Sequence, residues 1–114
     1  MDELDVAWLA GIIEGEGSLT KNKYNSWQLQ ITMTDKDVIE KISQLVDQKM
    51  WKKKKYKETE KQAYKVTLCH KDKLRQLLPR LMPYMGQRRY NRMEECMWSI
   101  ENLRLTKDDK IWDA

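Results

Sequence analysis

Two glutamates with a single residue between them, Glu14 and Glu16, end the apolar segment LAGIIEGEG at residues 9–17. Apolar residues recur before them at helical spacing, so both carboxylates are predicted at the C-terminal end of a helix. The helix dipole disfavours a negative charge there by about 0.3–1 kcal/mol. Because carboxylate oxygens are the ligands that hard divalent cations prefer, this placement is typical of a metal site rather than of a helix end selected for stability.

A stripe of small residues leads to these acids along one face of the predicted helix. Small residues allow two helix backbones to approach closely, so the stripe predicts contact with a second copy of the helix or with another element of the same chain. In the first arrangement, two copies of Glu16 would repel each other unless a divalent cation lay between them. We therefore favour a metal site shared by two chains. The stripe consists of Ala7, Ala10, Gly11 and Glu14.

Other catalytic groups are scarce in the sequence. His70 is the only histidine, and Cys69 and Cys96 lack the paired spacing of a zinc site. We interpret the cysteines as reduced structural residues and the histidine as a surface residue. Catalysis through a histidine base or a cysteine nucleophile is therefore disfavoured, and any metal would be a hard cation held by carboxylates.

The chain of 114 residues suits one domain, which we place at residues 1–104 with a C-terminal tail at 105–114. Its net charge of +4 is unevenly distributed, since residues 1–20 contain five acids and no base whereas residues 21–80 contain 16 Lys/Arg and 7 Asp/Glu. The basic middle segment predicts a polyanionic partner, with nucleic acid first. No run approaches a membrane span, and the acidic N-terminus is unlike a targeting peptide, so we expect an intracellular, unprocessed protein with no membrane partner.

The pattern of elements predicts an α+β domain of the order αββαββα(α) with one four-stranded antiparallel sheet. Helices cover one face of this sheet, and the other face should be open. We expect helices at residues 3–16, 35–46, 71–82 and 87–103, strands at 18–24 and 27–34, and a hairpin over 49–70 that turns near 58–61.

The segment WQLQITMT, residues 27–34, alternates apolar and polar residues, so its glutamines and threonines are predicted on the open face. A solvated sheet face would explain such polarity, but glutamine can also pair with adenine in the DNA major groove, and lysine can contact guanine or phosphate. Given their strand context, we expect Trp51 and Tyr56, in the lysine-rich strand, to pack in the hairpin or the core rather than to stack on bases. The candidate DNA-binding residues on the sheet and its loops are Thr20, Asn22, Gln28, Gln30, Thr32, Lys53, Lys55, Lys65 and Thr67.

The segment LAGIIEGEG resembles the signature of the LAGLIDADG family of homing endonucleases. It differs by isoleucine for leucine, glutamate for each aspartate and glycine for alanine. The segments TDKDVIEKI and LMPYMGQRRYN and the order of elements also match, so the resemblance covers nearly the whole chain. It implies a site-specific double-strand DNA endonuclease that uses Mg²⁺, with Mn²⁺ as a substitute. A chain with one signature acts as a homodimer on a long pseudo-palindromic duplex, with the small-residue stripe at the helix seam.

The resemblance also implies roles for individual residues. The last acid of the signature, Glu16, is the catalytic metal ligand, with backbone carbonyls near Gly15 helping. The basic residue that stabilises the transition state falls on Arg88, with Arg89 beside it as a DNA contact or helix-start residue. A polar residue that positions water aligns with Met33 or Thr34, and methionine cannot take this role.

Two alternatives stay open on the sequence alone. One keeps the fold without the chemistry, as a DNA-binding regulator or an intron RNA maturase. The other is an unrelated α+β interaction module, for which Glu16→Gln would be neutral or stabilising and the protein monomeric.

Overall fold

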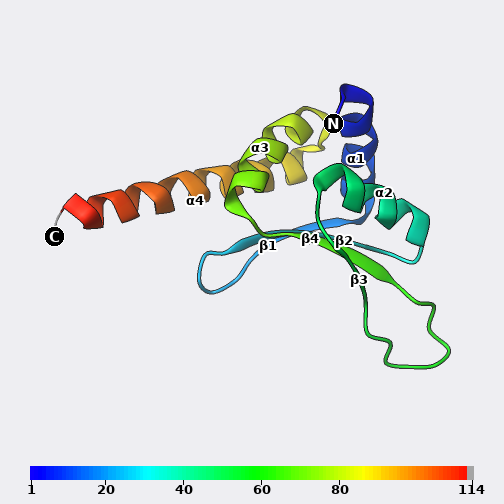
Figure 1. The fold of residues 1–114 in the computed structure, drawn as a ribbon. Coiled ribbons are helices and arrows are strands. Elements are labelled where there is room, and N and C mark those ends of the chain that lie inside the picture. The colour runs from blue at the N-terminus through cyan, green and yellow to red at the C-terminus, as the bar shows by residue number, and fades with distance from the viewer. Residues whose placement is uncertain (113–114) are drawn as a thin grey trace.

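A computed structural model gives the fold of the chain, describing the backbone of residues 1–112 and the side chains of residues 1–102. One antiparallel sheet has its strands in the order β1-β2-β4-β3, and Figure 1 shows the helices gathered on one side of it. The predicted α+β class and element order are confirmed. The elements are α1 (Glu3–Glu16), β1 (Gly17–Lys21), β2 (Trp27–Met33), α2 (Lys36–Val46), β3 (Met50–Lys52), β4 (Tyr64–Leu68), α3 (Lys71–Leu81), the 3₁₀ turn η1 (Met82–Tyr84) and α4 (Gln87–Trp112).

The core lies between the sheet and the helices. Strand β2 contributes Trp27, Leu29 and Ile31, which are buried, while Gln28 faces the other side. This is the alternation expected of a strand with one covered face. The helices pack onto it through apolar side chains at helical spacing, among them Leu9, Ile13, Ile39, Ile42, Leu74, Leu78 and Met93.

Helix α1 begins at a capping box, in which the Asp2 carboxylate accepts a hydrogen bond from the Asp5 backbone N–H at 2.8 Å. It runs through Gly15 to Glu16, the end predicted from the sequence. Strand β1 follows without a loop. As a result, the last carboxylate of the helix lies directly at the start of the sheet.

Three boundaries differ from those predicted. Strand β1 ends at Lys21 because the Asn22 side-chain oxygen accepts hydrogen bonds from the N–H groups of Tyr24 and Ser26, closing a turn. Strand β3 is only three residues long, so the lysines that follow it lie in a loop that extends away from the helices (Figure 1). Helix α4 continues to Trp112, past the predicted end at residue 103. The predicted tail at 105–114 includes residues 113–114, which lie outside the described residues.

No helix within residues 1–112 has both the length and the apolar character needed to cross a membrane.

Gly17 joins α1 to β1 at a point with no room for a side chain. Its N–H donates to the Ile13 carbonyl oxygen, and a Cβ at this position would lie 2.8 Å from that oxygen and 2.9 Å from the Ile13 side chain. We expect Gly17→Ala to lower the free energy of unfolding by about 1–3 kcal/mol, the usual effect of overpacking. Urea unfolding would measure it. The control is Gly86→Ala, whose Cβ would meet only the flexible end of Glu14, and an equal loss there would contradict this explanation.

Candidate active site and nucleic-acid interface

The carboxylate of Glu16 is exposed at the last residue of α1. Its side chain forms no hydrogen bond or ion pair with any residue in the described part of the chain. Gly15 precedes it in the final turn, where backbone carbonyls lack helical partners. The end of α1 therefore presents one uncommitted carboxylate together with main-chain oxygens.

Glu14 differs sharply from Glu16 because the chain itself holds it. The Gly86 N–H donates to its Oε2 at 3.3 Å, and Arg89 Nε lies 3.8 Å from the same oxygen. Arg89 Nε also donates to the Glu14 carbonyl oxygen at 3.0 Å. These contacts join the end of α1 to the start of α4. Glu14, predicted at the dimer seam, and Arg89, predicted as a DNA contact, thus contact each other within one chain.

The start of α1 is fastened to the same region. Arg80 in α3 donates to Glu3 Oε1 at 3.0 Å, and the Tyr84 hydroxyl donates to Glu3 Oε2 at 3.1 Å. Hydrogen bonding by Arg80, and then by Tyr84, lowers the pKa of Glu3 below its usual value. Helix α1 is therefore held at both ends by the segment from α3 to α4.

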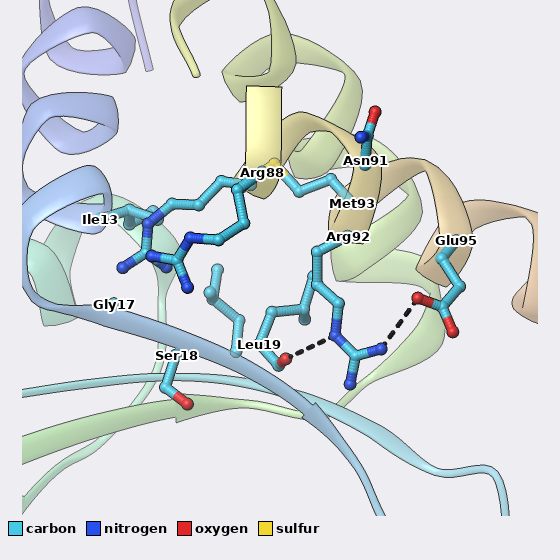
Figure 2. A pocket seen from close by; sticks show the side chains of 11 residues that line it. Ile13, Gly17, Ser18, Leu19, Arg88, Asn91, Arg92, Met93 and Glu95 are labelled. Carbon is cyan, nitrogen blue, oxygen red and sulfur yellow. Dashed lines mark hydrogen bonds and ion pairs between the residues drawn. The ribbon is translucent and has the colours of Figure 1, made fainter. Parts of the chain in front are cut away.

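Three arginines from the first turns of α4 line a hollow of about 430 Å³ between α4 and the start of β1. Figure 2 shows Arg88 reaching from α4 toward Ile13 and Gly17. Arg92 is engaged, since it donates to the Leu19 carbonyl and to Glu95 and lies over the Trp27 ring. Arg88 is exposed and has no hydrogen bond or ion pair among the described residues. The hollow therefore contains one guanidinium free to take an anion beside the end of α1.

The outer face of the sheet carries the predicted polar residues in register. Thr20 is paired with Gln28, Gln30 with Thr67, and Thr32 with Lys65. Their strands turn Leu19, Leu29 and Val66 to the core, so these three pairs share the uncovered side of the sheet. The remaining candidates lie in loops, with Asn22 closing the β1–β2 turn and Lys53 and Lys55 exposed after β3.

A model of the family described as LAGLIDADG-like domain matches residues 3–82 of the chain. The chain belongs to the LAGLIDADG family. The resemblance seen in its signature is thereby confirmed. No curated protein sequence matches it.

Solved LAGLIDADG structures share the fold at low sequence identity. The homing endonuclease I-CvuI, in complex with its target in the presence of Ca, is 17% identical with a TM-score of 0.70 over 96% of this chain and 74% of that one. The group I intron-encoded I-CeuI, complexed with DNA, is 18% identical with a TM-score of 0.67 over 98% of this chain and 59% of that one. The archaeal intron-encoded I-Vdi141I, also with DNA, is 18% identical with a TM-score of 0.64 over 83% and 67%.

The LAGLIDADG helix α1 exposes a different set of small residues from the one predicted. Ala10 is only 1% exposed and packs in the core of its own chain, and Ala7 is half-buried. Gly11 and Gly15 are exposed, and a Cβ on either would find no atom within 4 Å. Their spacing of four residues places them on one open stripe of the helix, which begins at Leu4, 82% exposed.

The expectation that Trp51 and Tyr56 pack in the hairpin or the core is wrong. Tyr56 is 80% exposed in the β3–β4 loop, and Trp51 is 51% exposed on β3. Strand β3 is an edge strand of only three residues, so no neighbouring strand covers Trp51 on its far side. Lysines occur on both faces of this predicted strand, so its sequence pattern could not show which face the rest of the chain covers.

Arg92 is a site residue that the sequence analysis missed. Its signal was its spacing, because it lies three and four residues after Arg89 and Arg88, on the same side of the predicted helix. Cys96 behaves as expected of a structural residue, since it is buried and burial raises the pKa of its thiol to about 12, whereas Cys69 is exposed.

Proposed function

We propose that the chain is a site-specific double-strand DNA endonuclease that acts as a homodimer and hydrolyses phosphodiester bonds with Mg²⁺. The observation that carries this proposal is the Glu16 carboxylate, unpaired among the described residues, at the end of the LAGLIDADG helix, while Arg88, also unpaired there, lines the hollow next to Ile13 and Gly17 at the same helix end. Glu14, two residues earlier, is by contrast held by Gly86 and Arg89 of its own chain. Relatives of the same fold were solved bound to DNA.

The donors at the end of α1 fit Mg²⁺. They are oxygens only, the Glu16 carboxylate and the Gly15 carbonyl, and hard cations prefer such ligands. Within the described residues, no three histidine, cysteine or acidic side chains gather into a metal site. Glu16 from a second chain, together with phosphate oxygens and water, would complete the ligand set. A bound Mg²⁺ supplies an activated water and stabilises charge on the scissile phosphate.

The open stripe of α1 supports the homodimer. Gly11 and Gly15 leave its surface flat, so a second copy can approach to backbone distance and bring two Glu16 side chains together. This sequence contains one signature, and a two-fold pair of identical chains would bring one signature helix to each DNA strand. Such a pair matches a pseudo-palindromic site.

The outer sheet face would then lie in the major groove. Gln28, Gln30 and Lys65 offer hydrogen bonds to base edges, and the exposed loop lysines offer charge to the phosphates. Binding should therefore weaken strongly as the salt concentration rises. Arg88 would stabilise the charge that develops on the phosphate during hydrolysis, since it carries no competing ion pair among the described residues.

Selective cleavage of a randomised duplex library in Mg²⁺ tests the proposal. We expect the wild-type protein to enrich one long pseudo-palindrome among the cut molecules. Binding of one sequence without cleavage in Mg²⁺ or Mn²⁺ would instead support a DNA-binding regulator. That second candidate is favoured by Met33, which packs against the core and is one of two residues, with Thr34, that align with the family's polar, water-positioning residue.

Replacing Arg88 by glutamine is expected to lower the cleavage rate by about 10²–10³-fold, the usual effect of removing one group that stabilises transition-state charge. Duplex affinity should fall much less, because the loop lysines carry most of the phosphate contacts. Single-turnover cleavage and a binding titration separate the two effects. Arg88→Lys keeps the charge and should recover part of the rate, and a rate unchanged in Arg88→Gln would remove this residue from the mechanism.

A further inference from the structure

Trp51 occupies an unusual place on the outer face of the sheet. Strand register pairs it with Lys65, while its neighbour Met50 pairs with the buried Val66 and packs against the core. Side chains alternate along a strand, so Trp51 points away from the core. Its neighbours across the sheet on that side are Lys65 and then Thr32.

The chain does not need this indole for its own packing. Trp51 remains 51% exposed even though Lys49 Nζ lies over its ring at 4.2 Å. Leaving so large an apolar surface in water is unfavourable, by the general relation between apolar area and transfer free energy. On the sheet face proposed to lie against DNA, this indole therefore offers a large apolar surface to a partner.

The chemistry of the surroundings specifies that partner. Lys49 and the exposed lysines after β3 favour a polyanion, and the neighbouring Lys65 and Thr32 suit base edges. Within the major groove, the thymine C5-methyl group is the apolar feature that base pairs display. A side chain standing on a strand meets the edges of stacked bases rather than their faces, so contact with this methyl group is favoured over stacking.

We propose that Trp51 is a specificity-determining residue that selects thymine at one position of each half-site, by packing its indole on the C5-methyl group. This inference rests on the proposed DNA-binding function. The hydrogen-bonding residues beside it read polar groups, whereas Trp51 reads an apolar one that cytosine lacks. It also gives a role to Lys49, whose ammonium group lies over the ring and would offer a positive charge to a neighbouring phosphate.

Deoxyuridine substitution tests the proposal, because it removes the methyl group and keeps the base pair. Duplexes of the selected sequence would carry uracil for thymine at one position at a time, and dissociation constants would be measured without divalent metal to prevent cleavage. We expect one position per half-site at which uracil weakens wild-type binding by about fourfold, the ratio that corresponds to burying one such group. Trp51→Ala should bind the thymine and uracil duplexes equally there.

The controls separate the two levels of the inference. Tyr56→Ala removes another exposed aromatic residue and should keep the full uracil effect. If wild-type protein tolerates uracil at every position, or if Trp51→Ala keeps the same uracil penalty, thymine selection by Trp51 is overturned while DNA binding stands. If no duplex is enriched at all in the library selection, both the proposed function and this inference are overturned. The uracil effect on wild-type binding is measured without any variant. The proposal can therefore be overturned even if Trp51→Ala folds poorly.

Discussion

Replacing Glu16 by glutamine is expected to lower the cleavage rate of the selected duplex by about 10³-fold or more. The substitution removes a charged ligand oxygen, and metal stabilisation of the transition state contributes several kcal/mol, with each 1.36 kcal/mol equal to tenfold in rate. The exposed side chain has no partner among the described residues, so the fold should not be weakened. Single-turnover cleavage in Mg²⁺ and thermal unfolding would measure both.

Glu14→Gln is the matched control for this prediction. It makes the same chemical change two residues earlier in the same helix. The glutamine oxygen can still accept the hydrogen bond from the Gly86 N–H, so only the ion pair with Arg89 is lost. We expect its cleavage rate to stay within about tenfold of wild type, since partly exposed ion pairs contribute little. Equal losses in the two variants would contradict the separate roles given to the two acids.

Replacing Gly11 by leucine is expected to abolish both dimer formation and cleavage. The new side chain would project into open space in the single chain, so the fold is retained and the helix propensity improves. In the proposed dimer, the same side chain would hold the two α1 helices apart and separate the Glu16 carboxylates. Sedimentation velocity would give the oligomeric state, with cleavage measured on the same samples.

Two further variants make the Gly11 experiment decisive. Asp37→Leu adds an equally apolar side chain to an exposed position of α2 and should leave assembly and cleavage intact. Gly11→Ala adds a single methyl group and should weaken the dimer by a smaller amount. A dimeric, active Gly11→Leu protein would show that the open stripe of α1 is not the seam.

Local patterns in the sequence were sufficient to predict the order of helices and strands and the faces that they bury. The strict alternation in β2 and the spacing of leucines in α3 each identify one element and its buried face, because each pattern depends on nearby residues alone. The position of Glu16 at a helix end was predictable for the same reason. These features determine the α+β class, the open sheet face and the acid at the end of the first helix.

Sequence patterns predicted the wrong contacts in two situations. In one, two faces of the same element carry similar residues, and in the other, the contact joins residues far apart in the sequence. Ala10 and Gly11 are both small and adjacent, and only the direction of the sheet decides which of them is buried. The partnership of Glu14 with Arg89 joins residues 75 positions apart, which no local pattern can indicate. Trp51 looked like a core residue because tryptophan usually is one, and its exposure follows from the shortness of β3.

The contacts that hold both ends of α1 affect the order in which the protein folds. Every contact that fastens it spans 72–81 residues of sequence. Closing loops of this length costs conformational entropy before the contacts form, so they are late events in folding. The two ends of α1 are thus fixed only after α3 and the start of α4 have been made. Under the proposed function, a growing chain that has not yet reached Arg89 would lack the contacts that hold Glu14, and the helix end that carries Glu16 would not yet be positioned for cleavage.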